Sequence, residues 1–184
     1  GQARESDLRE RICKLAMELI EIEERNSSER ITIVGHSSGS FVLAMLAAQL
    51  KRMPEAKEIL NKIELITLGQ NLTNLTIYPR AKFFRDDLKL LAMQPRFRWK
   101  DITSQEDLLC FAGVNPFTSC GLDTPEGEQY PIMKIISLKP KKKSPPRRYI
   151  LLNQFNIHFD YLRNYCPDVD LPGLLIQPHK EPKQ

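Results

Sequence analysis

The segment Gly35-His36-Ser37-Ser38-Gly39 places a serine between two glycines, one two residues before it and one two residues after it. A short β-branched run precedes the segment at 31–34, and an Ala- and Leu-rich stretch follows at 40–53, so the pattern has a strand–turn–helix context. A serine on so sharp a turn takes a strained backbone conformation that lifts its hydroxyl clear of the sheet. The flanking glycines leave room where the chain passes close to itself. We therefore predict that Ser37 is a nucleophile.

The predicted helix after this turn would direct its N-terminal amides at the reacting atoms, where a backbone N–H stabilises a developing oxyanion. The amide of Ser38 is the first candidate for such a donor. As nucleophiles, Ser38 and Ser40 are weaker candidates, because only Ser37 has glycine at both positions. A turn of small residues without chemistry is the alternative interpretation.

A serine hydroxyl needs a general base, normally a neutral histidine oriented by a carboxylate. The chain has three histidines, His36, His158 and His179. We expect His36, next to Ser37, to point away from it and to serve in packing or hydrogen bonding. His179 lies in a Pro- and Lys-rich tail. His158, between the last predicted strand and the last predicted helix, is therefore the predicted base; a buried histidine that caps that helix is the alternative.

The chain order Ser, then acid, then His places the carboxylate between Ser37 and His158, just after the third predicted strand. Asp107 is the first choice and Glu106 the second. The remaining candidates are less well placed: Asp101 within the strand, Asp86 and Asp87 expected to face solvent on a helix, and Asp123 in a later loop.

Apolar periodicity indicates the elements that would position these residues. It predicts helices over 8–25, 40–53, 84–93 and 159–165, and strands over 31–34, 63–68, 97–103 and 132–138; 149–154 reads as a strand end or turn. This alternation favours an α/β protein, a three-layer α/β/α sandwich with a mostly parallel sheet. We expect one domain over 1–166 and a Pro-rich, extended or disordered tail over 167–184.

These segments resemble the α/β-hydrolase fold family in its lipase/esterase-like branch. The resemblance covers about residues 8–165, and its fragments are similar to a group of poorly characterised bacterial hydrolase-like proteins: 33–40, 66–70, 104–107 and 157–162. It implies that Ser37, Asp107 and His158 form a triad that cleaves an ester or related acyl bond of a small-molecule substrate. Such a reaction needs no metal or organic cofactor.

Two features depart from the family pattern. Family members have an earlier strand and loop that supply the second oxyanion-hole donor. Here the roughly thirty residues before the strand at 31–34 predict only one helix ahead of the elbow, the sharp turn at Ser37. We therefore expect a partial hydrolase fold, from a fragment or a minimal version. The second feature is a basic, Pro-rich stretch at 139–148, expected to be a solvated loop. Its cations could make weak contact with phosphate or an anionic membrane: Lys141, Lys142, Lys143, Arg147 and Arg148. The alternative function is accordingly a non-catalytic module that binds a protein partner or membrane through this loop.

The composition is that of one globular domain of 184 residues, with a net charge of +4 and 41% hydrophobic residues. So mild a charge, without aromatic residues in the basic stretch, argues against a nucleic-acid partner. No run is long and apolar enough for a membrane span, and no signal pattern is present. Four cysteines without metal-site spacing predict free thiols and a cytoplasmic protein. A membrane anchor, in addition to the contact through the basic stretch, would be expected upstream of Gly1.

Overall fold

The computed structural model describes residues 2–93, 96–122, 129–138 and 153–163, and the side chains from residue 5 onward within these ranges. The described strands form one parallel sheet in the order β1 (Ile31–His36), β2 (Ile63–Leu68), β3 (Arg98–Ser104) and β4 (Ile132–Ile136). Because all strands run the same way, their carboxyl ends meet at one edge of the sheet, where ligands bind in open α/β folds.

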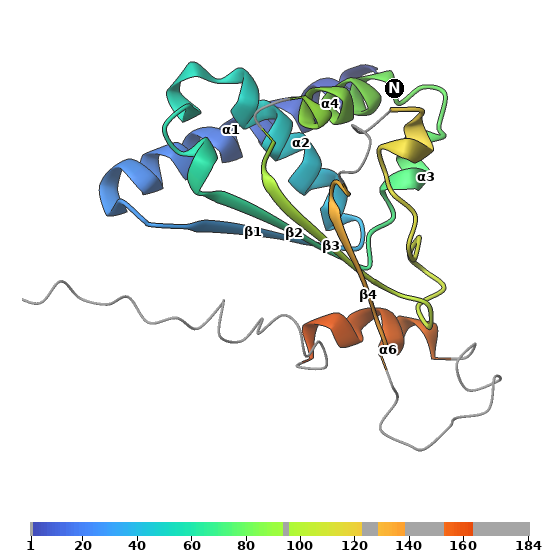
Figure 1. Cartoon of the computed structure of the whole chain (residues 1–184). Coiled ribbons are helices and arrows are strands. Elements are labelled where there is room, and N and C mark those ends of the chain that lie inside the picture. Colours follow the sequence, from blue (N-terminus) through green and yellow to red (C-terminus); the bar gives the residue numbers. More distant parts are fainter. Residues whose placement is uncertain (1, 94–95, 123–128, 139–152, 164–184) are drawn as a thin grey trace, which may run out of the picture.

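Helices cover the sheet on both faces, which makes the fold a three-layer α/β sandwich (Figure 1). One layer contains three helices, α1 (Gln2–Asn26), α2 (Gly39–Arg52) and α4 (Lys82–Ala92), and the opposite layer contains α6 (Gln154–Phe159). Shorter elements connect them: α3 (Leu72–Thr76) and the 3-10 helices η1 (Pro54–Ala56), η2 (Leu60–Lys62), η3 (Thr118–Cys120) and η4 (Asp160–Leu162).

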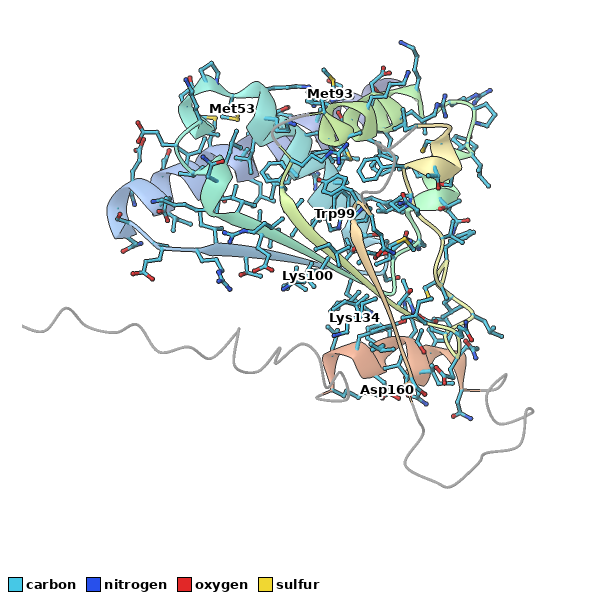
Figure 2. The ribbon with its side chains drawn as sticks, viewed as in Figure 1. Met53, Met93, Trp99, Lys100, Lys134 and Asp160 are labelled. Carbon is cyan, nitrogen blue, oxygen red and sulfur yellow. The ribbon has the colours of Figure 1, made fainter. Side chains whose placement is uncertain are left out.

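The larger core lies between the sheet and the layer of α1, α2 and α4. Strand side chains such as Leu65 and Trp99 project into it from alternate positions and are fully buried (Trp99 is labelled in Figure 2). The α2 helix contributes a face of small residues, with Ala44, Ala47 and Ala48 fully excluded from solvent. Small side chains let α2 approach the strands closely, so the start of this helix is held firmly against the end of β1.

The opposite face of the sheet divides into an apolar half and a charged half. At the carboxyl end, α6 and η4 bury Ile157 and Tyr161 against Leu68 and Ile102. At the amino end, Glu64 is buried and binds Lys100 at 2.8 Å, with Arg30 at 3.5 Å (Lys100 is labelled in Figure 2). The α6 helix therefore packs only over the half of the sheet that lies near the carboxyl ends of the strands.

Several elements occur where the periodicity predicts them, and β2 has the predicted bounds. The last helix is the main correction. It begins at Gln154, in a stretch predicted to be a strand end or turn, so His158 lies inside α6 and not before a helix that starts at Phe159. The physical reason is packing: Ile157 in α6 and Tyr161 in the following η4 segment both bury their side chains against the sheet. The short helix α3 also lies in a region where no regular element was expected.

In the described part of the chain, none of the helices combines the length and the apolar character needed to cross a membrane.

Candidate active site

The turn between β1 and α2 holds Ser37 in the left-handed region, with a φ of 55°. A non-glycine residue rarely adopts this conformation, which costs on the order of 1–3 kcal/mol unless neighbouring contacts impose it. Here the contacts are clear: the Ser37 amide donates to the carbonyl of Leu68 at 3.0 Å, and the Ser37 carbonyl accepts from the amide of Ser40 at 3.0 Å. The strained conformation expected for a serine on this sharp turn is therefore present.

The two glycines of the motif contribute differently. A Cβ atom on Gly35 would lie 2.8 Å from the carbonyl oxygen of Gly39 and 3.0 Å from the Cβ of Leu43, so the chain does pass close to itself at this point. A Cβ atom on Gly39 would meet no atom within 4 Å. The close approach that requires glycine is thus observed at Gly35. At Gly39 it is not, because a side chain there would point into open space.

The serines beside Ser37 have different surroundings. Ser40 is fully buried, and its hydroxyl donates to the Ser37 carbonyl at 2.5 Å, so it holds the turn together. Ser38 is exposed and directly precedes α2. That position places its backbone amide at the positive end of the helix dipole, which suits the predicted role as an oxyanion donor.

A histidine and a carboxylate form a buried pair at the same edge of the sheet. The Nδ1 atom of His158 lies 2.7 Å from the Oδ2 atom of Asp107, and the His158 and Asp107 side chains are 5% and 0% exposed. Burial alone would raise the pKa of Asp107. The hydrogen bonds from His158 and from the Leu109 amide, which lies 2.9 Å from Oδ1, outweigh burial and lower this pKa. The carboxylate therefore stays ionised beside the imidazole.

Gln154 connects the loop that carries Asp107 to the helix that carries His158. Its side-chain Oε1 accepts from the Leu108 amide at 2.7 Å, and its Nε2 donates to the Glu106 carbonyl at 3.3 Å. One side chain thus binds the backbone on both sides of Asp107. Nothing in the sequence pattern pointed to Gln154, because a lone glutamine at a helix start has no characteristic spacing.

Gly69 and Tyr161 shape the space around the Asp107 carboxylate. Gly69 has a φ of 54°, and a Cβ atom there would lie 2.7 Å from the Tyr161 ring and 3.1 Å from Asp107 Oδ2. Only glycine leaves room for both groups after β2. Tyr161 is fully buried, and burial together with the neighbouring Cys110 and Asp107 raises the pKa of its phenol. Tyr161 therefore remains an uncharged neighbour of the Asp107 carboxylate.

The second choice for the acid, Glu106, serves a different purpose. Its carboxylate accepts hydrogen bonds from the hydroxyls of Ser104 and Ser137 and from the amide of Leu138. It thereby joins the end of β3 to the end of β4. Burial would raise the pKa of Glu106, but these donors lower it.

The remaining carboxylates do not lie beside His158 in the described structure. Asp101 is buried within β3, as expected, and accepts from the Thr67 hydroxyl at 2.7 Å. Asp86 is partly exposed on α4, but the expectation that Asp87 faces solvent is wrong. Asp87 is 1% exposed and binds Arg52 at 2.5 Å, because the helical spacing turns it toward α2.

His36 has the packing and hydrogen-bonding role expected of it. Its Nε2 atom lies 2.7 Å from the backbone carbonyl oxygen of His158, and the centroids of the two imidazole rings are 4.7 Å apart. Because His36 immediately precedes Ser37, this contact joins the turn that bears Ser37 to α6. Of the predicted triad, His158 and Asp107 are joined directly, and Ser37 is linked to them through its neighbour in the chain.

The cysteines of the described residues, Cys13, Cys110 and Cys120, are free thiols with intermediate exposure. Cys110 lies closest to the site, with its sulfur 3.7 Å from the Tyr161 hydroxyl. Burial, then the charge of Asp107, raises the pKa of Cys110 to about 11. The thiol is therefore protonated near neutral pH and is a poor nucleophile.

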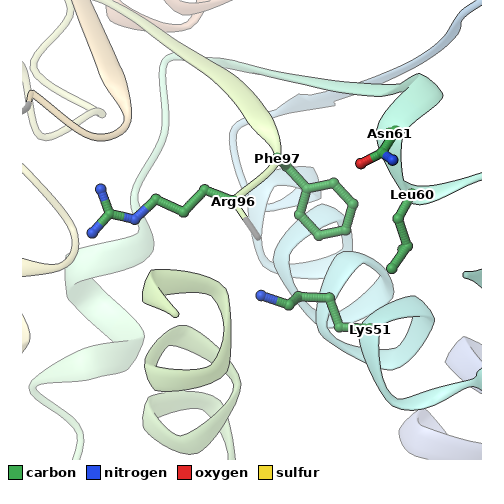
Figure 3. Close-up of a pocket in the computed structure, with 5 residues that line it drawn as sticks. All are labelled: Lys51, Leu60, Asn61, Arg96 and Phe97. Carbon is green, nitrogen blue, oxygen red and sulfur yellow. The ribbon is translucent and has the colours of Figure 1, made fainter. Parts of the chain in front are cut away.

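The hollow shown in Figure 3 is remote from this site. It is lined by Lys51, Leu60, Asn61, Arg96 and Phe97. Lys51 donates to the carbonyls of Leu90 and Met93 at 3.0 and 2.7 Å. The hollow lies at the amino ends of β2 and β3, and no nucleophile or carboxylate lines it. Phe84 and Phe97 are both buried in the larger core.

Several predicted residues lie outside the described ranges: Asp123, the basic stretch with Lys141, Lys142, Lys143, Arg147 and Arg148, Cys166, the tail over 167–184 and His179. Within the described ranges, no group of three or more His, Cys, Asp or Glu residues is arranged to bind a metal ion.

Comparisons with known proteins add no family to this description. No protein-family model matches the chain, and comparisons with curated proteins and with solved structures also gave no match. The fold and the geometry of the site therefore carry the functional conclusion.

Proposed function

We propose that the chain is a serine hydrolase with a partial α/β-hydrolase fold, which cleaves an ester or related acyl bond through an acyl-enzyme on Ser37. The observation that carries this proposal is the buried pair of His158 and Asp107, packed through His36 against the strained turn that bears Ser37. An imidazole oriented by a carboxylate and within reach of a serine is the arrangement that makes a hydroxyl nucleophilic. Here Asp107 orients His158, and His36 joins the His158 backbone to the residue before Ser37.

In this mechanism the Ser37 hydroxyl attacks the acyl carbon and its proton passes to Nε2 of His158. Asp107 holds Nδ1–H of the same ring and stabilises the imidazolium that forms. The Ser38 amide donates to the developing oxyanion. His158 then gives the proton to the leaving alcohol. Water, deprotonated by His158, releases the acyl group as a carboxylic acid and regenerates Ser37.

Hydrolysis of p-nitrophenyl esters of increasing chain length tests the proposal. The protein should release p-nitrophenol, and Ser37→Ala should lower the rate by roughly three orders of magnitude or more. Ser6→Ala, on the exposed surface of α1, is the matched control and should keep the wild-type rate. Equal rates for Ser37→Ala and the wild type would exclude Ser37 as the nucleophile.

A further inference from the structure

His36 makes a contact that the hydrolysis mechanism does not by itself require. It is the last residue of β1, yet its ring lies against the last helix, 4.7 Å from the ring of His158 and 5.0 Å from that of Phe159. Its Nε2 atom binds the His158 carbonyl at 2.7 Å. The last residue of β1, which directly precedes Ser37, thus holds the backbone of His158 by a hydrogen bond.

The carbonyl fixes the form of the His36 ring. A carbonyl oxygen only accepts hydrogen bonds, so Nε2 of His36 must carry a proton and donate it. Burial lowers the pKa of His36, and the nearby His158 lowers it further, while the carbonyl bond and Asp107 act in the opposite direction. Tyr161 in η4 also faces His36, with the ring centroids 6.1 Å apart, and burial raises the pKa of its phenol, so it adds no charge. The neutral ring with its proton on Nε2 is therefore the stable form, and it places no charge beside the imidazolium of His158.

The α6 helix needs such support because it is short. Gln154–Phe159 is far below the length at which a helix is stable in isolation, so its position depends on tertiary contacts. The carbonyls of its last turn also lack partners within the helix. His36 supplies one donor to this group, whereas Ile157 and Tyr161 anchor the buried face and Gln154 holds the first turn.

We propose that His36 is a positioning residue, which sets the place of the His158 imidazole relative to Ser37 through the hydrogen bond from Nε2 to the His158 carbonyl. This inference rests on the proposed function, in which His158 is the base. His36 does not touch the reacting atoms in this account. Its effect is to fix the distance over which the Ser37 proton moves, and misplacement of a catalytic group by about 1 Å can cost 10²-fold in rate.

Two substitutions of His36 distinguish the effect of its hydrogen bond from the effect of its aromatic ring. His36→Gln can carry an N–H donor to the position of Nε2 but loses the aromatic ring. His36→Phe keeps an aromatic ring against His158 and Phe159 but has no donor. We expect His36→Phe to lower kcat of ester hydrolysis by roughly 10- to 100-fold with little change in KM, and to alter its pH profile. His36→Gln should recover most of the rate and the wild-type profile.

An NMR measurement reports on the position of His158 without requiring any catalytic turnover. The proton on Nδ1 of His158 should give a downfield NMR resonance, because it is held against Asp107. In His36→Phe this resonance should broaden as exchange with water increases, and in His36→Gln it should stay sharp. If the wild type hydrolyses no ester, the proposed function fails and the NMR comparison alone decides the role of His36. Wild-type rates and an unchanged resonance in His36→Phe, or a His36→Gln variant as impaired as His36→Phe, would overturn the inference.

Discussion

The Nδ1 atom of His158 and the Oδ2 atom of Asp107 lie 2.7 Å apart with both side chains removed from solvent, although 51 residues separate them in the chain. A loop after β3 supplies one partner and a short helix on the far face of the sheet supplies the other. A buried, ionised carboxylate keeps a neutral imidazole in one tautomer, so Nε2 is left to act as a base. The consequences of this relationship can be measured.

Removal of the charge at Asp107 should impair catalysis much more than removal of the charge next to it. Asp107→Asn leaves the size of the side chain unchanged but no longer selects the tautomer of His158, and the ester hydrolysis rate should fall on the order of 10³- to 10⁴-fold. Glu106→Gln is the matched control. It weakens contacts between β3 and β4 and should cost about 1 kcal/mol of stability, with near wild-type turnover. Comparable losses of turnover in the two variants would mean that Asp107 is not the orienting acid.

The glycines of the elbow should respond in opposite ways to alanine. Gly35→Ala puts a Cβ atom 2.8 Å from the Gly39 carbonyl oxygen, and backbone must move to admit it. We expect a loss of about 1–3 kcal/mol in the free energy of unfolding, measured by urea denaturation. Gly39→Ala meets nothing within 4 Å and lies in the first turn of α2, so it should be neutral or stabilising by up to about 1 kcal/mol. A stable Gly35→Ala protein would contradict the close approach in this turn.

Asp101 should make stability depend on pH in the direction opposite to that of a paired carboxylate. Burial raises its pKa to about 7, and its hydrogen-bond partners Thr67 and Gln70 are neutral. The folded protein thus holds a proton that the unfolded chain releases near pH 4. The free energy of unfolding should therefore fall as pH rises from about 4 to 7, by up to about 1.4 kcal/mol per pH unit from this group.

Asp101→Asn tests this dependence, because the amide can keep both partners without a titrating proton. Urea midpoints of the wild type and the variant, compared at pH 5 and pH 8, isolate the contribution of Asp101 from that of other groups. The variant should lose less stability between the two conditions than the wild type. Parallel changes in both proteins would show that Asp101 does not titrate in this range.

Gln154 should matter because it binds the backbone on both sides of Asp107. Gln154→Ala removes both contacts, so the loop that carries Asp107 is no longer held in a fixed position against α6. We therefore expect the rate of ester hydrolysis to fall roughly tenfold. Asn156→Ala, on the exposed face of the same helix, removes a side chain whose described hydrogen bond is to Asn153 and should keep the wild-type rate. If the two variants behave alike, the bridge from Gln154 does not position Asp107.

The sequence was sufficient to predict the elements whose signals are local. The strand 63–68 and the helix after the elbow follow from apolar runs bounded by turn residues. Chain order and the loop after the third strand make Asp107 the first choice to pair with His158, but they leave Glu106 as a second candidate. The placement of His158 inside α6 did not follow, because 149–154 has strand-forming residues and the helix depends on packing of Ile157 and Tyr161 on the sheet.

The supporting contacts of the site were not predictable for the same reason. Gln154, Gly69 and Tyr161 each lie more than 35 positions from Asp107 in the chain, and each acquires its role only when the fold brings it to Asp107. The burial of Asp87 was likewise not predictable, since a single charged residue on a helix gives no sign of an arginine on the neighbouring helix.

Labelling with a fluorophosphonate probe tests the central claim most directly, because the probe reacts covalently only with a serine that its own site has activated. Intact mass and peptide mapping should find one probe molecule on Ser37 in the wild type, and labelling should be lost in Ser37→Ala and greatly slowed in Asp107→Asn. Absence of labelling in the folded wild type, or labelling that persists in Ser37→Ala, would contradict the account.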